Sequence, residues 1–286
     1  VRPGGTSAHL DGRGAVHPGA AAASRQYRPF ARRHREQVSS TQNRDPRARP
    51  RDGRDRHPGP GGHRMSEPFR RVAILGDGGW GTAISLVLLQ NGAKVTMWGH
   101  DPAYLQRMAE SRENERFLPG VPLPEALAFQ PDLDAALAGT DLAVVAIPTK
   151  YLRASLSRYN GGAANVAVVS LTKGIEQETL KRPTEIVDEY LPCARIAALS
   201  GPSHAEEVAR GLPVSLTAAA ADKAFSEQVQ ATFMAPRFRV YTSTDVVGVE
   251  LGGALKNVIA IAAGICQGLE LGDNAIAALL TRGLAE

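Results

Sequence analysis

Three glycines near residue 80 have the spacing that lets a chain turn around a phosphate. The stretch Val72-Ala73-Ile74-Leu75-Gly76-Asp77-Gly78-Gly79-Trp80-Gly81 is an apolar run that ends in the pattern G-x-G-x-x-G. Gly76 permits a tight turn, Gly78 leaves room for a pyrophosphate, and Gly81 allows helix and strand to pack closely. The pattern also fits a glycine-rich turn that binds nothing. Its place between a strand and the N-terminus of a helix favours a dinucleotide.

A lysine within an apolar helix is a second candidate for chemistry. Residues 245–271 are expected to form one long helix, and Lys256-Asn257 interrupts its apolar face. Lysine is rarely buried without a partner, so Lys256 either carries its ammonium to the surface or projects into a site between domains. Burial and a neighbouring positive charge would pull the pKa of such a lysine toward neutrality, which suits proton transfer.

The tip of the second strand carries no acidic residue. Strand 94–98 runs into Trp98-Gly99-His100-Asp101. A site selective for NAD usually places Asp or Glu at this tip, on the ribose hydroxyls. His100 could tolerate a 2′-phosphate instead, or lie in an exposed loop without a role. We therefore expect NADP to be accepted alongside NAD.

The elements that must position these residues alternate between strand and helix. Strands are expected at 72–75, 94–98, 127–129, 141–148, 165–171 and 195–199. Helices are expected at 82–89, 103–111, 133–138, 152–159 and 180–190, with Asp132 as an N-cap and a proline-rich loop at 117–122. This alternation predicts an α/β fold. A Rossmann-type doubly wound sheet would span 69–243, and an all-helical second domain would begin at 244–286. Ligands bind such sheets at the carboxyl ends of the strands.

Charge divides the sequence into two parts. Residues 1–64 hold 14 Arg, no Lys and 5 acidic residues, and the rest carries a net charge of −5, which leaves +4 in total. The first part has too few large apolar residues for a core, which predicts a disordered extension. It fits a nucleic-acid-binding arm, a transit peptide, or translated upstream sequence before Met65. The third interpretation is favoured, because position 1 is not Met and no nucleic-acid-binding motif accompanies the arginines.

The remaining composition is that expected of a cytoplasmic protein. No secretory signal is recognisable, and charged residues interrupt the most apolar region, 246–266, so we expect no membrane insertion. Cys193 and Cys266 have the spacing of neither a metal site nor a disulfide framework. We expect two buried thiols and no metal.

Several of these stretches together resemble the bacterial-type NAD(P)-dependent sn-glycerol-3-phosphate dehydrogenases. The matching stretches are 76–83, 98–101, 170–174, 200–203, 252–257, 272–274 and 281–286. The resemblance runs in order from about Arg71 to the last residue. It implies that NAD(P) is held by Gly76, Gly78, Gly79, Trp80, Gly81, His100, Lys173 and Ala205. It also implies that Lys173, Gly201, Ser203, Lys256 and Asn257 bind substrate and that Lys256 and Lys173 are catalytic.

The sequence departs from the family at a few places. Asp77 and Gly79 replace the Ala and Ser that are common in the family's loop, and His204 replaces a larger apolar residue. Ser203 and Glu206 also have the S-x-x-E spacing of a capping box, so Ser203 could simply begin a helix. The family continues beyond the last residue with Gly-Leu-Gly-Asp and Ser-Arg-Asn segments. We therefore expect a fragment that binds NADH, turns over poorly and self-associates through the helix at 245–271.

The reaction implied by the resemblance is reversible hydride transfer between glycerol 3-phosphate and dihydroxyacetone phosphate. Lys256 would exchange the proton of the C2 oxygen, and Lys173 would polarise that oxygen. Reduction would supply glycerol 3-phosphate for phospholipid synthesis. The expected partner is a small phosphorylated substrate, without nucleic acid, and a homodimer is allowed. The alternatives are another hydroxyacid dehydrogenase with a Rossmann domain and a helical domain, and a dinucleotide-sensing module without catalysis.

Overall fold

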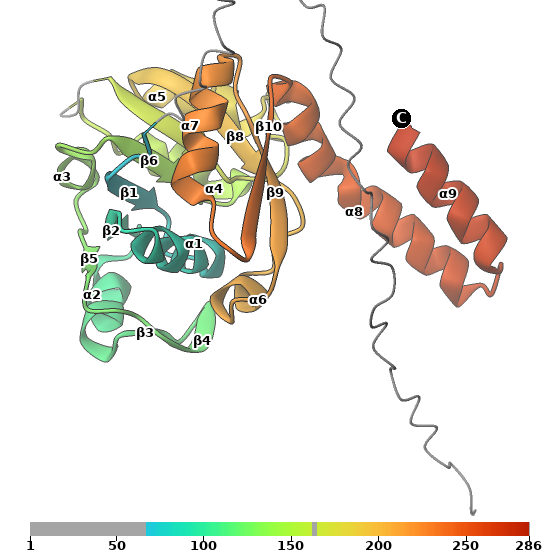
Figure 1. Cartoon of the computed structure of the whole chain (residues 1–286), viewed down its shortest axis with the longest axis horizontal. Coiled ribbons are helices and arrows are strands. Elements are labelled where there is room, and N and C mark those ends of the chain that lie inside the picture. Colours follow the sequence, from blue (N-terminus) through green and yellow to red (C-terminus); the bar gives the residue numbers. More distant parts are fainter. Residues whose placement is uncertain (1–66, 162–164, 286) are drawn as a thin grey trace, which may run out of the picture. The chain divides into compact units, whose positions relative to one another are not determined.

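An eight-stranded sheet lies at the centre of the part of the chain that the computed structural model describes, residues 67–161 and 165–285 (Figure 1). In spatial order its strands are β10 (Phe238–Ser243), β9 (Val214–Ala219), β8 (Cys193–Ser200), β7 (Val166–Ser170), β6 (Leu142–Val145), β1 (Arg71–Leu75), β2 (Lys94–Trp98) and β5 (Leu127–Phe129). Neighbouring strands are parallel except β8 and β9. The order reverses at β1, which lies between β6 and β2, and this is where a doubly wound sheet binds its ligand.

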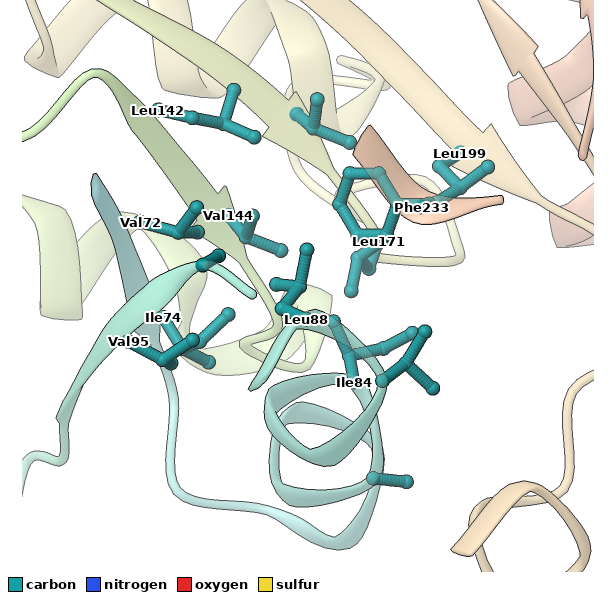
Figure 2. Packing of buried hydrophobic residues seen from close by; sticks show 14 of the residues in the cluster. Val72, Ile74, Ile84, Leu88, Val95, Leu142, Val144, Leu171, Leu199 and Phe233 are labelled. Carbon is teal, nitrogen blue, oxygen red and sulfur yellow. The ribbon is translucent and has the colours of Figure 1, made fainter. Parts of the chain in front are cut away.

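Helices cover both faces of the sheet. Side chains of β1 alternate between the faces, with Val72 and Ile74 in one hydrophobic cluster and Ala73 and Leu75 in the other. The first cluster includes residues of α1 (Gly79–Gln90), α2 (Pro102–Ser111) and α7 (Lys223–Phe233). Figure 2 shows Ile84, Leu88 and Phe233 packed against strand residues such as Ile74 and Val144. The second cluster includes residues of α3 (Leu133–Leu137), α4 (Thr149–Leu156) and α5 (Pro183–Tyr190).

The predicted α/β doubly wound fold is confirmed, and three local predictions are corrected. The loop expected at 117–122 contains strand β4 (Leu118–Pro122), which pairs antiparallel with β3 (Glu113–Asn114) and buries Leu118. Helix α4 begins at Thr149 rather than 152, directly after Pro148. Helix α5 begins at Pro183 rather than 180, because Leu180 has a φ of +58° and Pro favours the first helical position.

The chain ends in two helices that pack on each other, α8 (Val246–Gly268) and α9 (Asp273–Ala285). Asp245 caps α8, since its Oδ1 accepts a hydrogen bond of 2.8 Å from the N–H of Gly248. Among the described residues, α8 is long and apolar enough to cross a membrane by length and composition, a test that core helices of soluble proteins also pass. The expectation of no membrane insertion stays a prediction. The division at residue 244 stays a prediction, and the predictions for residues 1–64 lie outside the described residues.

Candidate active site

The glycine loop forms an open cradle at the start of α1. Gly76 has a φ of +125°, and a Cβ there would lie 2.6 Å from the carbonyl oxygen of Ala146. A Cβ at Gly81 would lie 2.3 Å from the carbonyl oxygen of Gly76, so both positions are restricted to glycine. Around Gly78, by contrast, the Cβ position has no atom within 4 Å, and no side chain caps α1. The free space and the unpaired N–H groups of the first turn fit the diphosphate of a dinucleotide.

Gly79 lies close to a further candidate residue, Ala205. Its Cβ position lies 2.4 Å from the carbonyl oxygen of Phe117 and 3.5 Å from the Cβ of Ala205. A serine at 79 would therefore collide with the backbone of the β3–β4 segment, which explains why glycine replaces it here. Trp80 is half-buried and packs against the first hydrophobic cluster. His100 is exposed after β2, and its carbonyl oxygen accepts a hydrogen bond from Arg158.

Lys173 is held in a polar setting after β7. Its Nζ donates to the carbonyl oxygen of Gly201 at 2.9 Å and to Ser203 Oγ at 2.6 Å. The hydroxyl of Thr149 donates to the Lys173 carbonyl oxygen at 2.7 Å and so fixes the backbone. Burial, and to a smaller extent the charge of Lys256, lower the pKa of Lys173. An ammonium has three N–H groups, so one donor of Lys173 stays available for a ligand.

Lys256 lines a cavity of about 350 Å³. The cavity is lined by Ser200, Gly201, Pro202, Thr217, Gly248, Val249, Gly252, Gly253 and Lys256. Lys256 is exposed, and its Nζ donates to Asn257 Oδ1 at 2.6 Å. The expectation that burial acts on Lys256 is therefore wrong for the described residues. Burial instead lowers the pKa of Lys173.

Close packing of α8 on β8 brings Lys173 near the cavity that Lys256 lines. A Cβ at Gly253 would lie 2.6 Å from Ser200 Oγ and 3.7 Å from Lys173 Cγ. The glycine thus allows the helix to approach the end of β8. The structure gathers Lys173, Gly201, Ser203 and Lys256, whereas Asn257 joins them only through Lys256.

Ser203 does not begin a helix, so the capping-box interpretation is wrong. Helix α6 (Ala205–Ala209) begins two residues later, with His204 as its N-cap and no capping side chain. The Ser203 hydroxyl donates to the carbonyl oxygen of Gly201 at 3.2 Å and accepts from Lys173. The hydroxyl thus bonds to Lys173 and Gly201 rather than to the N–H of Glu206, which a capping box would require.

Sequence reasoning missed Glu250, which is the buried residue of α8. Its carboxylate accepts hydrogen bonds from the Thr184 N–H at 2.9 Å, from the Thr184 hydroxyl at 2.6 Å and from Arg182 at 2.7 Å. These partners belong to the N-terminus of α5, so Glu250 ties α8 to the sheet domain. A glutamate in an apolar helix, shortly before Lys256, was the signal that could have indicated it.

A second ion-pair network supports the loop that carries Lys173. The Arg153 guanidinium donates to both oxygens of Glu176 at 2.9 and 2.8 Å and to Glu189 at 2.6 Å. The Arg153 contact, followed by the Thr179 hydroxyl, lowers the pKa of Glu176 to about 2. These groups border a larger cavity of about 670 Å³ that does not include either lysine of the candidate site.

The sequence matches two family models that together span most of the described residues. Residues 71–226 match the N-terminal region of NAD-dependent glycerol-3-phosphate dehydrogenase, and residues 245–286 match its C-terminal region. A glycerol-3-phosphate dehydrogenase [NAD(P)+] of Bacillus velezensis is 48% identical over 222 residues, which cover 76% of this chain and 64% of the relative. The enzyme of that name from Chlorobium phaeobacteroides is 42% identical over a match that covers 76% of this chain and 66% of that relative. The chain thus spans slightly less than two thirds of these relatives.

Solved structures agree with the sequence comparison. A crystal structure of glycerol-3-phosphate dehydrogenase from Coxiella burnetii has a TM-score of 0.68 and 39% identity, covering 76% of this chain and 66% of that one. The Plasmodium falciparum glycerol-3-phosphate dehydrogenase has a TM-score of 0.69 and 29% identity, and the match covers 77% of this chain and 64% of that one. The glycine cradle, the paired lysines and both family models thus lead to one assignment: the chain belongs to the NAD-dependent glycerol-3-phosphate dehydrogenase family.

Proposed function

We propose that the protein interconverts sn-glycerol 3-phosphate and dihydroxyacetone phosphate by hydride transfer with NAD(P)(H). The observation that carries this proposal is the proximity of two lysines, Lys256 on a cavity wall and Lys173 beside it, in a sheet domain that also has a dinucleotide cradle. The names of the relatives support the substrate and the cofactor. When bound, NAD(P)H supplies the hydride.

Side chains of the protein supply the proton transfer and the charge stabilisation that accompany hydride transfer. Lys256, exposed on the cavity wall, gives a proton to the C2 oxygen of the substrate during reduction and takes it back during oxidation. The free N–H of Lys173 donates to the same oxygen and stabilises the charge that develops on it. The Gly201 backbone and the Ser203 hydroxyl position Lys173 and border the substrate. Asn257 accepts a hydrogen bond from the Lys256 ammonium and holds it in place between catalytic turnovers.

The cradle residues are proposed to bind the dinucleotide. Gly76, Gly78, Gly79 and Gly81 shape the space for the diphosphate, and Trp80, His100 and Ala205 border it. The proposed setting is the cytoplasm, where reduction supplies glycerol 3-phosphate for phospholipid synthesis. A homodimer and the absence of nucleic acid or membrane insertion also belong to the proposal.

The test is oxidation of NADH by the whole protein with dihydroxyacetone phosphate, followed by the loss of NADH absorbance. Lys256→Ala should lower turnover by about 10² to 10⁴, the usual contribution of one acid–base group, while the Kd for NADH changes little. Turnover of a different 2-oxo substrate in place of dihydroxyacetone phosphate would support the alternative dehydrogenase. Binding of NADH without turnover of any substrate would indicate a sensing module.

A further inference from the structure

Asp77 is a buried carboxylate without a complete set of partners. It lies between the first two glycines of the cradle and is 8% exposed. Among the described residues its Oδ2 is the buried side-chain polar atom that lacks a hydrogen bond. Burial raises its pKa, because the charged form loses hydration. A buried acceptor without a donor is costly, so its presence at a ligand-binding edge calls for a donor from a ligand.

The carboxylate of Asp77 lies at the tip of β2, although the residue follows β1. The register pairs Leu75 with Trp98, so the segments after both strands leave the sheet side by side. Asp77 Oδ2 is 2.5 Å from the position that a Cβ would occupy at Gly99, the residue directly after β2. Glycine at 99 therefore leaves the space that this carboxylate fills.

This is the place where a Rossmann-type site presents its acidic residue to the adenosine ribose. The usual residue comes from the end of the second strand itself and accepts hydrogen bonds from the ribose hydroxyls. Here the second strand ends in Trp98, Gly99 and His100. The glycine loop of the neighbouring strand supplies the negative charge instead.

We propose that Asp77 makes the dinucleotide site selective for NAD(H) over NADP(H). Its carboxylate accepts a hydrogen bond from the ribose 2′-hydroxyl of the adenosine half and repels a 2′-phosphate. The inference rests on the proposed dinucleotide binding, and it narrows the NAD(P) of the relatives' names to a preference for NAD(H) in this protein.

Cations near the same tip oppose this preference. Arg116 and the neighbouring residues His100 and Asp101 act electrostatically on Asp77. Arg116 lies over the Tyr104 ring at 4.3 Å, and Arg158 donates to the His100 carbonyl oxygen. Both arginines thus have partners within the protein, whereas Asp77 Oδ2 does not. The ribose hydroxyl is the ligand group that completes this set of hydrogen bonds.

The experiment compares the Kd values of NADH and NADPH by fluorescence titration of the whole protein and of three variants. The wild-type protein should bind NADH about 10²-fold or more tightly than NADPH, since like charges placed together are strongly disfavoured. Asp77→Ala should reduce this ratio to within about fivefold. Asp77→Asn keeps an acceptor without the charge, so NADPH should bind more tightly while NADH affinity changes only a few-fold. Circular dichroism establishes that each variant is folded.

The control is Asp101→Asn, at the same tip. Asp101 Oδ1 caps α2 by accepting from the N–H groups of Ala103 and Tyr104, and asparagine keeps this role. Its Kd ratio should stay much closer to that of the wild type than the ratio of Asp77→Asn does, because the α2 N–H groups already engage the Asp101 carboxylate. Equal wild-type affinities for the two cofactors, an unchanged ratio in Asp77→Asn, or a collapsed ratio in Asp101→Asn would overturn the inference and leave the proposed function standing. Failure of both cofactors to bind would overturn the proposed function and the inference with it.

Discussion

Replacement of Glu250 by alanine tests whether one buried carboxylate anchors α8. The side chain is 2% exposed and pairs with an Arg182 side chain that is 20% exposed. Few other residues of α8 are shielded from solvent, and Val258 and Ile261 are each 65% exposed. The position of Lys256 relative to Lys173 therefore depends on Glu250 and on the Gly253 contact.

The expected loss follows from the groups that Glu250→Ala leaves without a partner. Removing one partner of a buried ion pair usually costs about 3–5 kcal/mol, and each unsatisfied buried group costs about 1–3 kcal/mol. Thr184 is 5% exposed and loses the acceptor for both its N–H and its hydroxyl. Arg182 is partly solvated and keeps its ion pair with Glu185. We therefore expect a decrease of about 3 kcal/mol in the free energy of unfolding.

Urea unfolding followed by circular dichroism measures this change, and amide hydrogen exchange locates it. Exchange should accelerate in α8 before it accelerates in α1, since α8 loses its anchor. Glu250→Gln keeps an acceptor for the Thr184 N–H and should cost about half as much. The exposed Glu178 provides the control, because Glu178→Ala should change stability by less than about 0.5 kcal/mol. A Glu250→Ala variant as stable as this control, with unchanged exchange in α8, would refute the anchoring role.

Three further predictions follow from local geometry. Burial, and then the charge of Asp188, raise the pKa of the Cys193 thiol from 9.0 to about 12. At pH 8 Cys193 should thus react with a thiol reagent about 10³-fold more slowly than an ordinary cysteine, as measured by mass spectrometry. The Arg153 guanidinium lowers the pKa of Glu176 from the ordinary 4.5 to about 2. Its stabilising contribution should be complete above pH 4.5 and disappear as the pH falls toward 2, so Glu176→Gln should flatten acid unfolding in that range. Gly79→Ser would place a Cβ 2.4 Å from the Phe117 carbonyl oxygen. Thermal unfolding should show that the free energy of unfolding decreases by about 1–3 kcal/mol.

Several parts of the fold could be predicted because their causes are local. Glycine at 76 is required by a positive φ, and Asp132 caps α3 through its own neighbour Ala135. The apolar run at β6 is buried on both faces, as a central strand requires. Such features depend on a few consecutive residues, so the spacing of residue types predicts them.

Other features depend on pairing across the sheet and could not be predicted in the same way. Strand β9 runs antiparallel to β8, and β4 forms where a proline-rich loop was expected. Ser203 has the spacing of a capping box, but Lys173, from a different strand end, takes its hydroxyl. A local motif is weaker than a charged donor that the fold brings within hydrogen-bond distance.

The sequence by itself determined the doubly wound fold, the glycine cradle and Lys256 as a candidate, because periodicity and turn chemistry are properties of neighbouring residues. Lys173 became a candidate through the resemblance to the family. Only the tertiary structure decided that Glu250 is buried at the start of α5 and that Lys173, rather than Lys256, loses hydration. It likewise decided that an acidic side chain stands at the tip of β2, since Asp77 reaches Gly99 through the register of β1 and β2. Burial and charge at a site depend on which distant segments meet there, and that is determined by packing of the whole sheet rather than by spacing along the chain.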